Sequence, residues 1–570
     1  MAEFNDKQAH VADKETLEPH HGVDYPVDQE SGVINNTNKL NRDLQSRHMQ
    51  MIAIGTSIFS SAEKDDFQSI HKTRLTRNPG GAIGAGLFVG SGSALNTGGP
   101  APLVICYSII GVMLLFTCQA LAELAVLYPV NGAFYTYVVR FIDPSWGFAM
   151  GWDYAISWLT ILPFELVAAS ITISYWRDDL NMGIWVAVFL VVLCCIQFFG
   201  VRGYGEVEFV LSMIKIAACT GFIILGIVIN CGGVGNRGYL GAKYWHDPGA
   251  FKNGFNGFCS VFVVAAFAFG GTELVGLAAA ESANPRKAIP LATKQVFWRI
   301  FFFYVVNLFI VGLILPSNDD RLLNSTGANT KASPFVLAIE DAGIKVLPSI
   351  FNAVITLAVI SVANSCTFGS TRTMQAMAER GMAPKALAYV DKHGRPIWCI
   401  VVQIAFGLLA FIGEASSEST IFTWLLSLSG LSYFFVWGTI CATHIRFRRA
   451  WKKHGHSLDL IPYKPTLGIW GSWIGLVLCS LCLIAVFYSS LYPSPNATPS
   501  AEYFFEQYLA APVVLVLYLF WKLYTRDWRF LVPIAEMDML AGARLHNPED
   551  LEDELPQKQS WLMRIVHGLI

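Results

Sequence analysis

Three ionisable side chains lie inside long apolar stretches of the sequence. They are Glu165, Lys215 and Glu273. A charged group at that depth in a hydrocarbon layer is costly unless it is paired or hydrated, which makes it a candidate for function. A carboxylate there can take up and release a proton, while Lys215 can supply a fixed positive charge where a sodium ion would otherwise sit. The alternative is that Lys215 pairs with a carboxylate only to hold helices together.

Two glycine-rich stretches interrupt apolar segments. They are residues 80–92 (GGAIGAGLFVGSG) and 265–281 (AAFAFGGTELVGLAAAE). Glycine is a poor helix former, so each stretch marks a place where the helix opens. Inside a membrane, opened backbone is tolerated only where protein buries it or where it lines a watery cavity, and its freed N–H groups can bind an anionic group. We therefore expect the two stretches to form two halves of one substrate site.

Hydroxyl and amide side chains recur in two further apolar stretches. They are Ser361, Asn364 and Ser365 in one, and Ser427, Ser429 and Ser432 in the other. Such residues can face a central cavity or bond a neighbouring helix, and the sequence favours neither interpretation.

The composition is that of a polytopic membrane protein. Of the 570 residues, 54% are hydrophobic and 14% charged, a balance outside the range of soluble domains. The net charge of −2 and the lack of a basic stripe disfavour nucleic acid as a partner. The cysteines stand mostly alone, so we expect no disulfide framework and no metal site. No phosphate-binding motif ends in Gly-Lys-Ser or Gly-Lys-Thr, so we do not expect an ATPase. We also expect no other enzymatic activity and no cofactor.

Apolar segments long enough to cross a bilayer recur along the chain. We place them at 48–55 plus 80–97, 101–127, 147–175, 182–201, 207–231, 254–282, 293–316, 346–370, 397–414, 419–443, 468–491 and 508–525. The fold class predicted is therefore all-α, with twelve transmembrane helices between residues 48 and 525.

The basic residues predict the orientation. The connections after the sixth, eighth and tenth spans are the richest in Lys and Arg, which places them and both termini in the cytoplasm. Residues 1–47 are polar and acid-rich without an initial apolar stretch, so we expect a disordered cytosolic tail and no signal peptide. Its Lys7 and Lys14 are candidate targets of the ubiquitin ligase machinery, and residues 526–570 form a second cytosolic tail. The sequons at Asn324 and Asn496 then fall outside the cell.

Several of these stretches together resemble the fungal amino acid permeases of the amino acid–polyamine–organocation superfamily, and most closely the general amino acid permeases. They are residues 81–92, 269–276, 284–287, 370–374 and 444–448, within a likeness that covers about residues 45–540. The resemblance implies two inverted five-helix repeats of the LeuT-like type, followed by two C-terminal helices. It also implies import of L-amino acids across the plasma membrane by proton symport.

The same resemblance implies a substrate site built from backbone. Gly84, Ala85, Gly86 and Leu87 would be the unwound part of helix 1 that receives the carboxylate. Phe267, Ala268, Phe269, Gly270 and Gly271 would receive the α-amino group, with Phe267 as an aromatic gate. Ala85 stands where many relatives have Thr or Ser, which removes a hydroxyl but leaves the backbone amides.

Binding through backbone groups does not depend on the side chain of the substrate. It therefore favours a transporter that accepts a broad range of amino acids. The alternatives are a narrower permease, for proline or basic amino acids, and a sensor on the same fold that does not transport.

A polar insert, residues 56–79, departs from the family pattern. It carries eight ionisable groups in the middle of the first predicted span, and no buried helix could hold that many unpaired. Gly55-Thr56-Ser57 and Asn78-Pro79-Gly80 can be encoded with the donor and acceptor sequences of a fungal intron, and removing the insert in frame joins Ile54-Gly to Gly81-Ala82. We therefore interpret the insert as a retained intron, with a genuine loop of this chain as the alternative.

Overall fold

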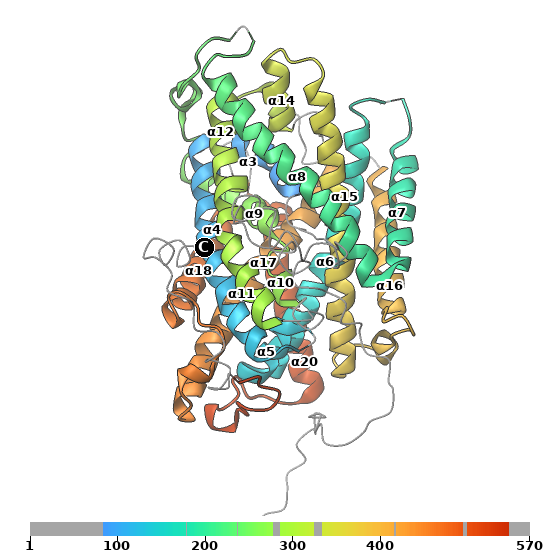
Figure 1. Cartoon of the computed structure of the whole chain (residues 1–570), viewed down its shortest axis with the longest axis vertical. Coiled ribbons are helices and arrows are strands. Elements are labelled where there is room, and N and C mark those ends of the chain that lie inside the picture. The colour runs from blue at the N-terminus through green and yellow to red at the C-terminus, as the bar shows by residue number, and fades with distance from the viewer. Residues whose placement is uncertain are drawn as a thin grey trace, which may run out of the picture. The chain divides into compact units, whose positions relative to one another are not determined.

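A computed structural model describes residues 84–130, 132–177, 179–235, 237–277, 285–323, 333–414, 418–493 and 499–545. Over these residues the chain is helical, with turns and no strand (Figure 1). The tail at 1–47, the insert at 56–79 and the two sequons lie outside the described residues.

Long helices form the body of the bundle. They are α4 (Pro100–Leu127), α6 (Pro144–Ile173), α8 (Gly200–Asn230), α15 (Leu347–Glu379), α17 (Glu418–Lys453), α18 (Ile469–Leu491) and the continuous run α11 (Pro285–Arg299), η3 (Ile300–Val306) and α12 (Asn307–Ile314). The shorter apolar helices are α7 (Met182–Phe198), α9 (Gly254–Phe269) and α16 (Ile397–Gly407) with η6 (Leu408–Glu414), and α19 (Ala501–Tyr508) meets α20 (Ala510–Thr525) at a bend of 70°.

The predicted all-α membrane fold is confirmed. Seven helices of the described part are long and apolar enough to cross a bilayer, or eight if the bent pair is one span. The other predicted spans are short or broken in the described part of the chain, so the count of twelve stays a prediction. The two spans with glycine-rich breaks are the first and the sixth of the predicted spans. Their separation by five spans fits a pair of five-helix repeats.

Helix α6 occupies the centre of the bundle. Asp143 caps it by accepting a hydrogen bond from the Trp146 N–H at 3.0 Å, and Pro144 supplies its first turn. Its most apolar 18 residues are 89% buried. The helix packs along α15, α17 and α20, so most of its side chains are buried within the protein.

Two short helices that the sequence analysis did not predict connect the spans. α5 (Ala133–Phe141) lies between α4 and α6, and α14 (Pro334–Asp341) lies at the upper end in Figure 1. Ser333, just before α14, donates a hydrogen bond to the Phe88 carbonyl at 2.7 Å, and the Phe335 ring meets the Phe88 ring edge-on at 5.2 Å. α14 therefore packs directly on the glycine-rich stretch of the first span.

The described part of the C-terminal tail, residues 526–545, is packed against the lower end of the bundle. The Val532 N–H donates to the Ile142 carbonyl at 2.8 Å. The Tyr128 hydroxyl donates to the Met539 carbonyl at 2.7 Å. These bonds tie the tail to the ends of α4 and α5.

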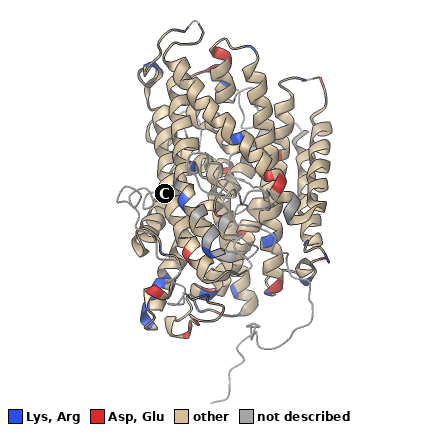
Figure 2. Ribbon diagram, in the orientation of Figure 1, with Lys and Arg blue, Asp and Glu red and all other residues tan. Residues whose placement is uncertain are grey.

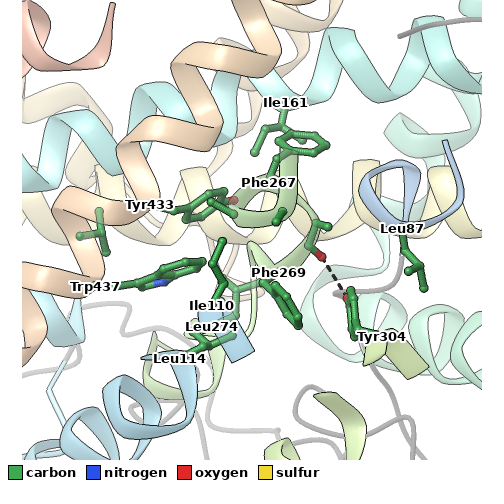
Figure 3. Packing of buried hydrophobic residues seen from close by; sticks show 14 of the residues in the cluster. Leu87, Ile110, Leu114, Ile161, Phe267, Phe269, Leu274, Tyr304, Tyr433 and Trp437 are labelled. Atoms are coloured by element: carbon green, nitrogen blue, oxygen red, sulfur yellow. Dashed lines mark hydrogen bonds between the residues drawn. The ribbon is translucent and has the colours of Figure 1, made fainter. Parts of the chain in front are cut away.

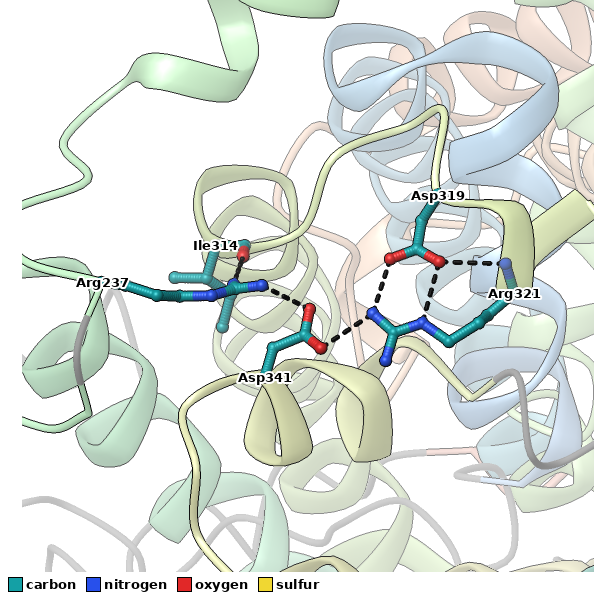
Figure 4. A network of polar contacts seen from close by, with 5 residues as sticks. All are labelled: Arg237, Ile314, Asp319, Arg321 and Asp341. Carbon is teal, nitrogen blue, oxygen red and sulfur yellow. Dashed lines mark hydrogen bonds and ion pairs between the residues drawn. The ribbon is translucent and has the colours of Figure 1, made fainter.

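An ionic network anchors α14 (Figure 4). Asp341 accepts from Arg237 at 2.6 Å and from Arg321 at 2.8 Å, and Arg321 also holds both oxygens of Asp319, at 2.9 and 2.6 Å. The hydrogen bonds from Arg321 hold the pKa of the Asp319 carboxyl below its usual range. The network joins the end of α14 to α13 (Asp320–Leu323) and to the connection that follows α8.

We expect Asp319→Asn to lower the free energy of unfolding by about 1 kcal/mol or less at pH 7, because Arg321 is partly exposed. A depressed pKa in the folded state stabilises the fold above the unfolded value of about 3.9, and that stabilisation is lost as the pH falls through the folded-state pKa. Thermal unfolding of the purified protein from pH 7 to pH 3 measures this, and the difference between the variant and the wild type should begin to shrink at the acid end.

The exposed Arg177–Asp179 pair has the same chemistry and provides the control. Asp179→Asn should leave the unfolding midpoint unchanged. A deficit in Asp319→Asn that grows toward pH 3, or that Asp179→Asn reproduces, would contradict the account.

Candidate functional site

The first half of the site is the start of the first span. Gly84 is extended, with φ −149° and ψ −150°, and leads into α2 (Ala85–Phe88), which breaks at Val89 before α3 (Gly90–Gly98). Every residue of α2 is buried. The first N–H groups of a helix have no intrahelical acceptor. The Leu87 N–H donates to the Gly84 carbonyl at 3.2 Å, which leaves the N–H groups of Ala85 and Gly86 to donate to a ligand.

The second half is the break after α9. Gly270 leaves the helix and Gly271 has φ +92°, a conformation that favours glycine, before the chain resumes as α10 (Leu274–Leu277). Glu273 holds this turn. Its carboxylate accepts from the Gly271 N–H at 3.2 Å, the Tyr154 hydroxyl at 3.1 Å and the Trp437 indole N–H at 3.2 Å.

The two breaks meet in space, as the sequence analysis expected. A Cβ atom placed on Gly86 would lie 2.4 Å from the Cα of Ala268, so the two backbones are in direct contact. Tyrosines secure both sides: the Tyr107 hydroxyl reaches the Gly86 carbonyl at 3.4 Å, and the Tyr304 hydroxyl donates to the Ala268 carbonyl at 2.9 Å (Figure 3).

Aromatic rings enclose the second break. Phe267, the predicted gate, lies beside Ile161 (Figure 3) and meets Phe164 edge-on at 4.9 Å. Tyr433 lies so close to Gly270 that a Cβ atom on the glycine would be 2.3 Å from its ring. The break is thus lined by aromatic faces from α6 and α17.

The carbonyl groups at the end of α9 already accept hydrogen bonds. Phe267 accepts from the Gly270 N–H at 3.2 Å and Ala268 from Tyr304, while Phe269 accepts from both the Thr272 hydroxyl at 2.9 Å and the Thr272 N–H at 3.4 Å. A carbonyl oxygen has two lone pairs. Phe267 and Ala268 therefore keep the capacity to accept a second bond, as from an ammonium group, whereas the Phe269 carbonyl is already occupied.

Glu165 lies against the first break. The residue is 1% exposed, and its Oε1 would be 3.8 Å from a Cβ on Gly84. Its Oε2 has no hydrogen-bond partner among the described residues. The structure therefore brings this predicted coupling residue to the predicted carboxylate subsite.

Lys215 forms a salt bridge with Glu208, a carboxylate that the sequence analysis did not single out. Its Nζ lies 3.5 Å from Glu208 Oε1 and donates to the Ser361 hydroxyl at 2.7 Å, and Ser361 in turn donates to Glu208.

The other two polar residues of that stretch also bond neighbouring helices. Asn364 accepts from Gln197 at 3.3 Å, and Ser365 is 3.3 Å from the Tyr204 hydroxyl. Of the two interpretations that the sequence left open for Ser361, Asn364 and Ser365, these contacts favour the bonding of helices.

Glu165, Lys215 and Glu273 are not alone among the buried ionisable groups of the predicted spans. Asp153 and Arg299, each 1% exposed, and Glu208, fully buried, are deep as well. Arg299 donates to the Thr272 hydroxyl at the second break, and Asp153 accepts from Ser432 at 2.8 Å. All three fall inside predicted spans. The signal that points to Glu165, an ionisable residue within an apolar span, therefore points to them too.

Gly86→Ala should separate the two breaks. The added methyl group would meet backbone rather than a movable side chain, and overpacking of this kind costs about 1–3 kcal/mol. Gly90→Ala is the matched control, because its nearest atom is a methyl group of Val264, which can rotate away. Thermal unfolding of the two purified variants should show the larger loss for Gly86→Ala; equal losses would contradict the contact.

Comparison with known proteins gives the family. A family model described as amino acid permease matches residues 75–533. An uncharacterized amino-acid permease of Schizosaccharomyces pombe is 50% identical over 93% of this chain and 85% of its own. The general amino-acid permease GAP1 of Saccharomyces cerevisiae is 46% identical over 93% and 84%, and cationic amino acid transporter 1 of S. pombe is 48% identical over 91% and 84%. With most of its length matched by these fungal relatives, the chain belongs to the amino acid permease family.

Proposed function

We propose that this permease imports L-amino acids across the plasma membrane by proton symport and accepts a broad range of side chains. The observation that carries the proposal is the contact between the two helix breaks at Gly86 and Ala268. Opened backbone of this kind offers free donors on one side and spare acceptor capacity on the other, within a family of membrane transporters.

The backbone can bind both ends of an amino acid zwitterion. Its carboxylate would bind N–H groups of the segment Gly84 to Leu87, of which the Leu87 N–H already donates to the Gly84 carbonyl, at the positive end of a helix dipole. Its ammonium would bind the carbonyls of Phe267 and Ala268, each of which keeps one lone pair. Because no contact in this arrangement touches the substrate side chain, broad specificity follows.

The contacts of the two central carboxylates support different roles. Glu273 receives three hydrogen-bond donors, which suits a permanently ionised group that holds the second break. Glu165 has an oxygen without a partner among the described residues and lies against Gly84. We therefore assign the transported proton to Glu165, with Lys215 as the fixed charge and Glu273 as the support of the site.

The distribution of basic residues supports a cytosolic lower end. Figure 2 shows Lys and Arg gathered there, around the end of α17 and the connection that follows it. By the positive-inside rule this end faces the cytoplasm, with both termini. The N-terminal Lys7 and Lys14 are then on the side where a ubiquitin ligase acts.

A narrower permease for basic amino acids is the second candidate. One observation favours it: neither Asp153 nor Glu165 forms a salt bridge within the described part of the chain, so either carboxylate could pair with a cationic side chain. The relative named for cationic amino acids and the one named as general are almost equally similar, so identity does not separate the two candidates.

A panel of radiolabelled amino acids, tested in a strain without its own permeases at two external pH values, tests the proposal. We expect uptake of neutral, acidic and basic amino acids, faster at the lower pH. Uptake of basic amino acids alone would favour the second candidate, and uptake that does not depend on pH would contradict proton symport.

Glu165→Gln should abolish accumulation against a gradient while leaving exchange of internal for external amino acid partly intact, because glutamine imitates the protonated carboxyl. Glu273→Gln should impair both, because it removes the ionised acceptor of the second break. Full concentrative uptake by Glu165→Gln would remove proton coupling from that residue.

A further inference from the structure

We propose that a groove between α17, α18 and α20 binds a membrane sterol, a flat and apolar ring system with a single hydroxyl group. We call it the α17 groove. It lies behind the substrate site, on the side of α17 that faces away from the second helix break. The inference concerns binding to the folded protein, so it does not rest on the proposed transport activity.

The α17 groove has the size and lining of a ligand site. α18 and α20 both pack on α17, and between them lies a groove of about 380 Å³ whose wall is completed by the start of α6. Ligand sites usually enclose about 300–1,000 Å³ and are lined mainly by apolar and aromatic side chains with a few polar groups. The wall of this groove includes Trp146, Phe434, Gly438, Cys479, Leu483 and Tyr518.

The groove opens toward lipid. Ser480 lines it and is exposed, and this residue stands near the middle of α18 (Ile469–Leu491), one of the helices long and apolar enough to cross a bilayer. At that depth the surroundings are hydrocarbon. A ligand that enters the groove therefore comes from the membrane.

The polar end of the groove carries no net charge. Asp143 lines it and forms a salt bridge with Lys522 at 3.0 Å, with both side chains at most 3% exposed. The second carboxylate oxygen of Asp143 accepts from the Trp146 N–H at 3.0 Å. Because the two charges cancel, this end favours an uncharged ligand over the phosphate of a phospholipid. A carboxylate has about four lone-pair sites, so Asp143 can still accept from one hydroxyl group.

The walls of the groove suit a flat ligand. Small residues of α17 and α18, namely Gly438, Ala442 and Cys479, line it together with the rings of Phe434 and Tyr518. Side chains this small leave room for fused rings to lie along the helices. A rigid ligand also loses less conformational entropy on binding than a flexible acyl chain does.

The sequence of α20 gives an independent indication. Val516, Tyr518 and Lys522 match a short pattern proposed for sterol contact, in which a Leu or Val, a Tyr and a basic residue follow one another closely. The pattern alone is weak. Here its tyrosine lines the groove, and the Lys522 ammonium lies 5.4 Å from the centre of that tyrosine ring while it pairs with Asp143. The pattern and the groove thus coincide.

The groove adjoins a segment of α17 that holds the substrate site. Gly438 follows Trp437, whose indole N–H donates to Glu273 at the second break. A ligand in the groove would therefore pack behind that segment. Because a ligand that binds only the folded state stabilises it, we expect sterol to raise the unfolding midpoint of the protein.

Photolabelling of the full-length protein tests the proposal. The purified protein is placed in phosphatidylcholine vesicles with a sterol that carries a diazirine on its rings, and the labelled peptides are identified after illumination. We expect labels on the residues of α17 and α20 that line the groove. Unlabelled ergosterol should displace the probe, and phosphatidylserine at the same concentration should not.

Ala442→Phe should block the groove, because it places a ring in the space of the ligand. Overpacking of this kind corresponds to a loss of affinity of about tenfold or more, so labelling should fall by that factor and sterol should no longer raise the unfolding midpoint. Val477→Phe is the matched control. Val477 is 52% exposed on α18 outside the groove lining, so this variant should keep both effects.

If Ala442→Phe does not fold, Gly438→Ala provides the test. Its added methyl group would lie 3.4 Å from the Cβ of Cys479, an ordinary contact that the fold tolerates, and we expect a partial loss of labelling.

Four results would each overturn the inference. They are labelling that phosphatidylserine displaces as well as ergosterol does, labelling unchanged in the groove-filling variant that folds, no label in the groove, and cross-links across the groove between two copies of the chain. A wild type that binds sterol in the groove but transports no amino acid would contradict the proposed function and leave this inference standing.

Discussion

The structure depends on one constraint, that opened backbone inside a membrane must be enclosed by protein. Here the segments beside the two openings shield each other, because Gly86 in α2 and Ala268 in the last turn of α9 lie in backbone contact with no room for a side chain between them. The surrounding elements secure that contact: α14 packs on the first break from the upper end, and tyrosines on α4 and η3 bond the carbonyls on each side. The long helices are thus a frame for a few residues of irregular chain.

The buried charged groups differ in how fully they are hydrogen-bonded. Glu273 is saturated by three donors and fixes the second break, while Arg299 bonds the same turn through Thr272. Glu165 has unused acceptor capacity beside the first break. Lys215 and Glu208 form a bridged pair that adjoins it through α15.

The breaks were predictable because glycine inside an apolar run has a local meaning that needs no tertiary information. The all-α membrane fold followed from composition and segment length for the same reason. The partner of Lys215 was not predictable, since it depends on which face of α8 packs against α15 and on the serine found there. α14 was missed because a helix of eight residues is too short to show a distinctive period. The packing of residues 526–545 was missed because the side chains that bond its backbone carbonyls, such as Tyr128 and Arg140, lie far away in the sequence.

The central claim is that backbone at the two breaks recognises both charged ends of an amino acid. The most direct measurement is competition for uptake of a radiolabelled amino acid by the same amino acid, its methyl ester and its N-acetyl derivative. The account predicts strong competition by the free amino acid and poor competition by both derivatives, because each lacks one charge that the breaks would bind. Equal competition by the methyl ester would contradict it.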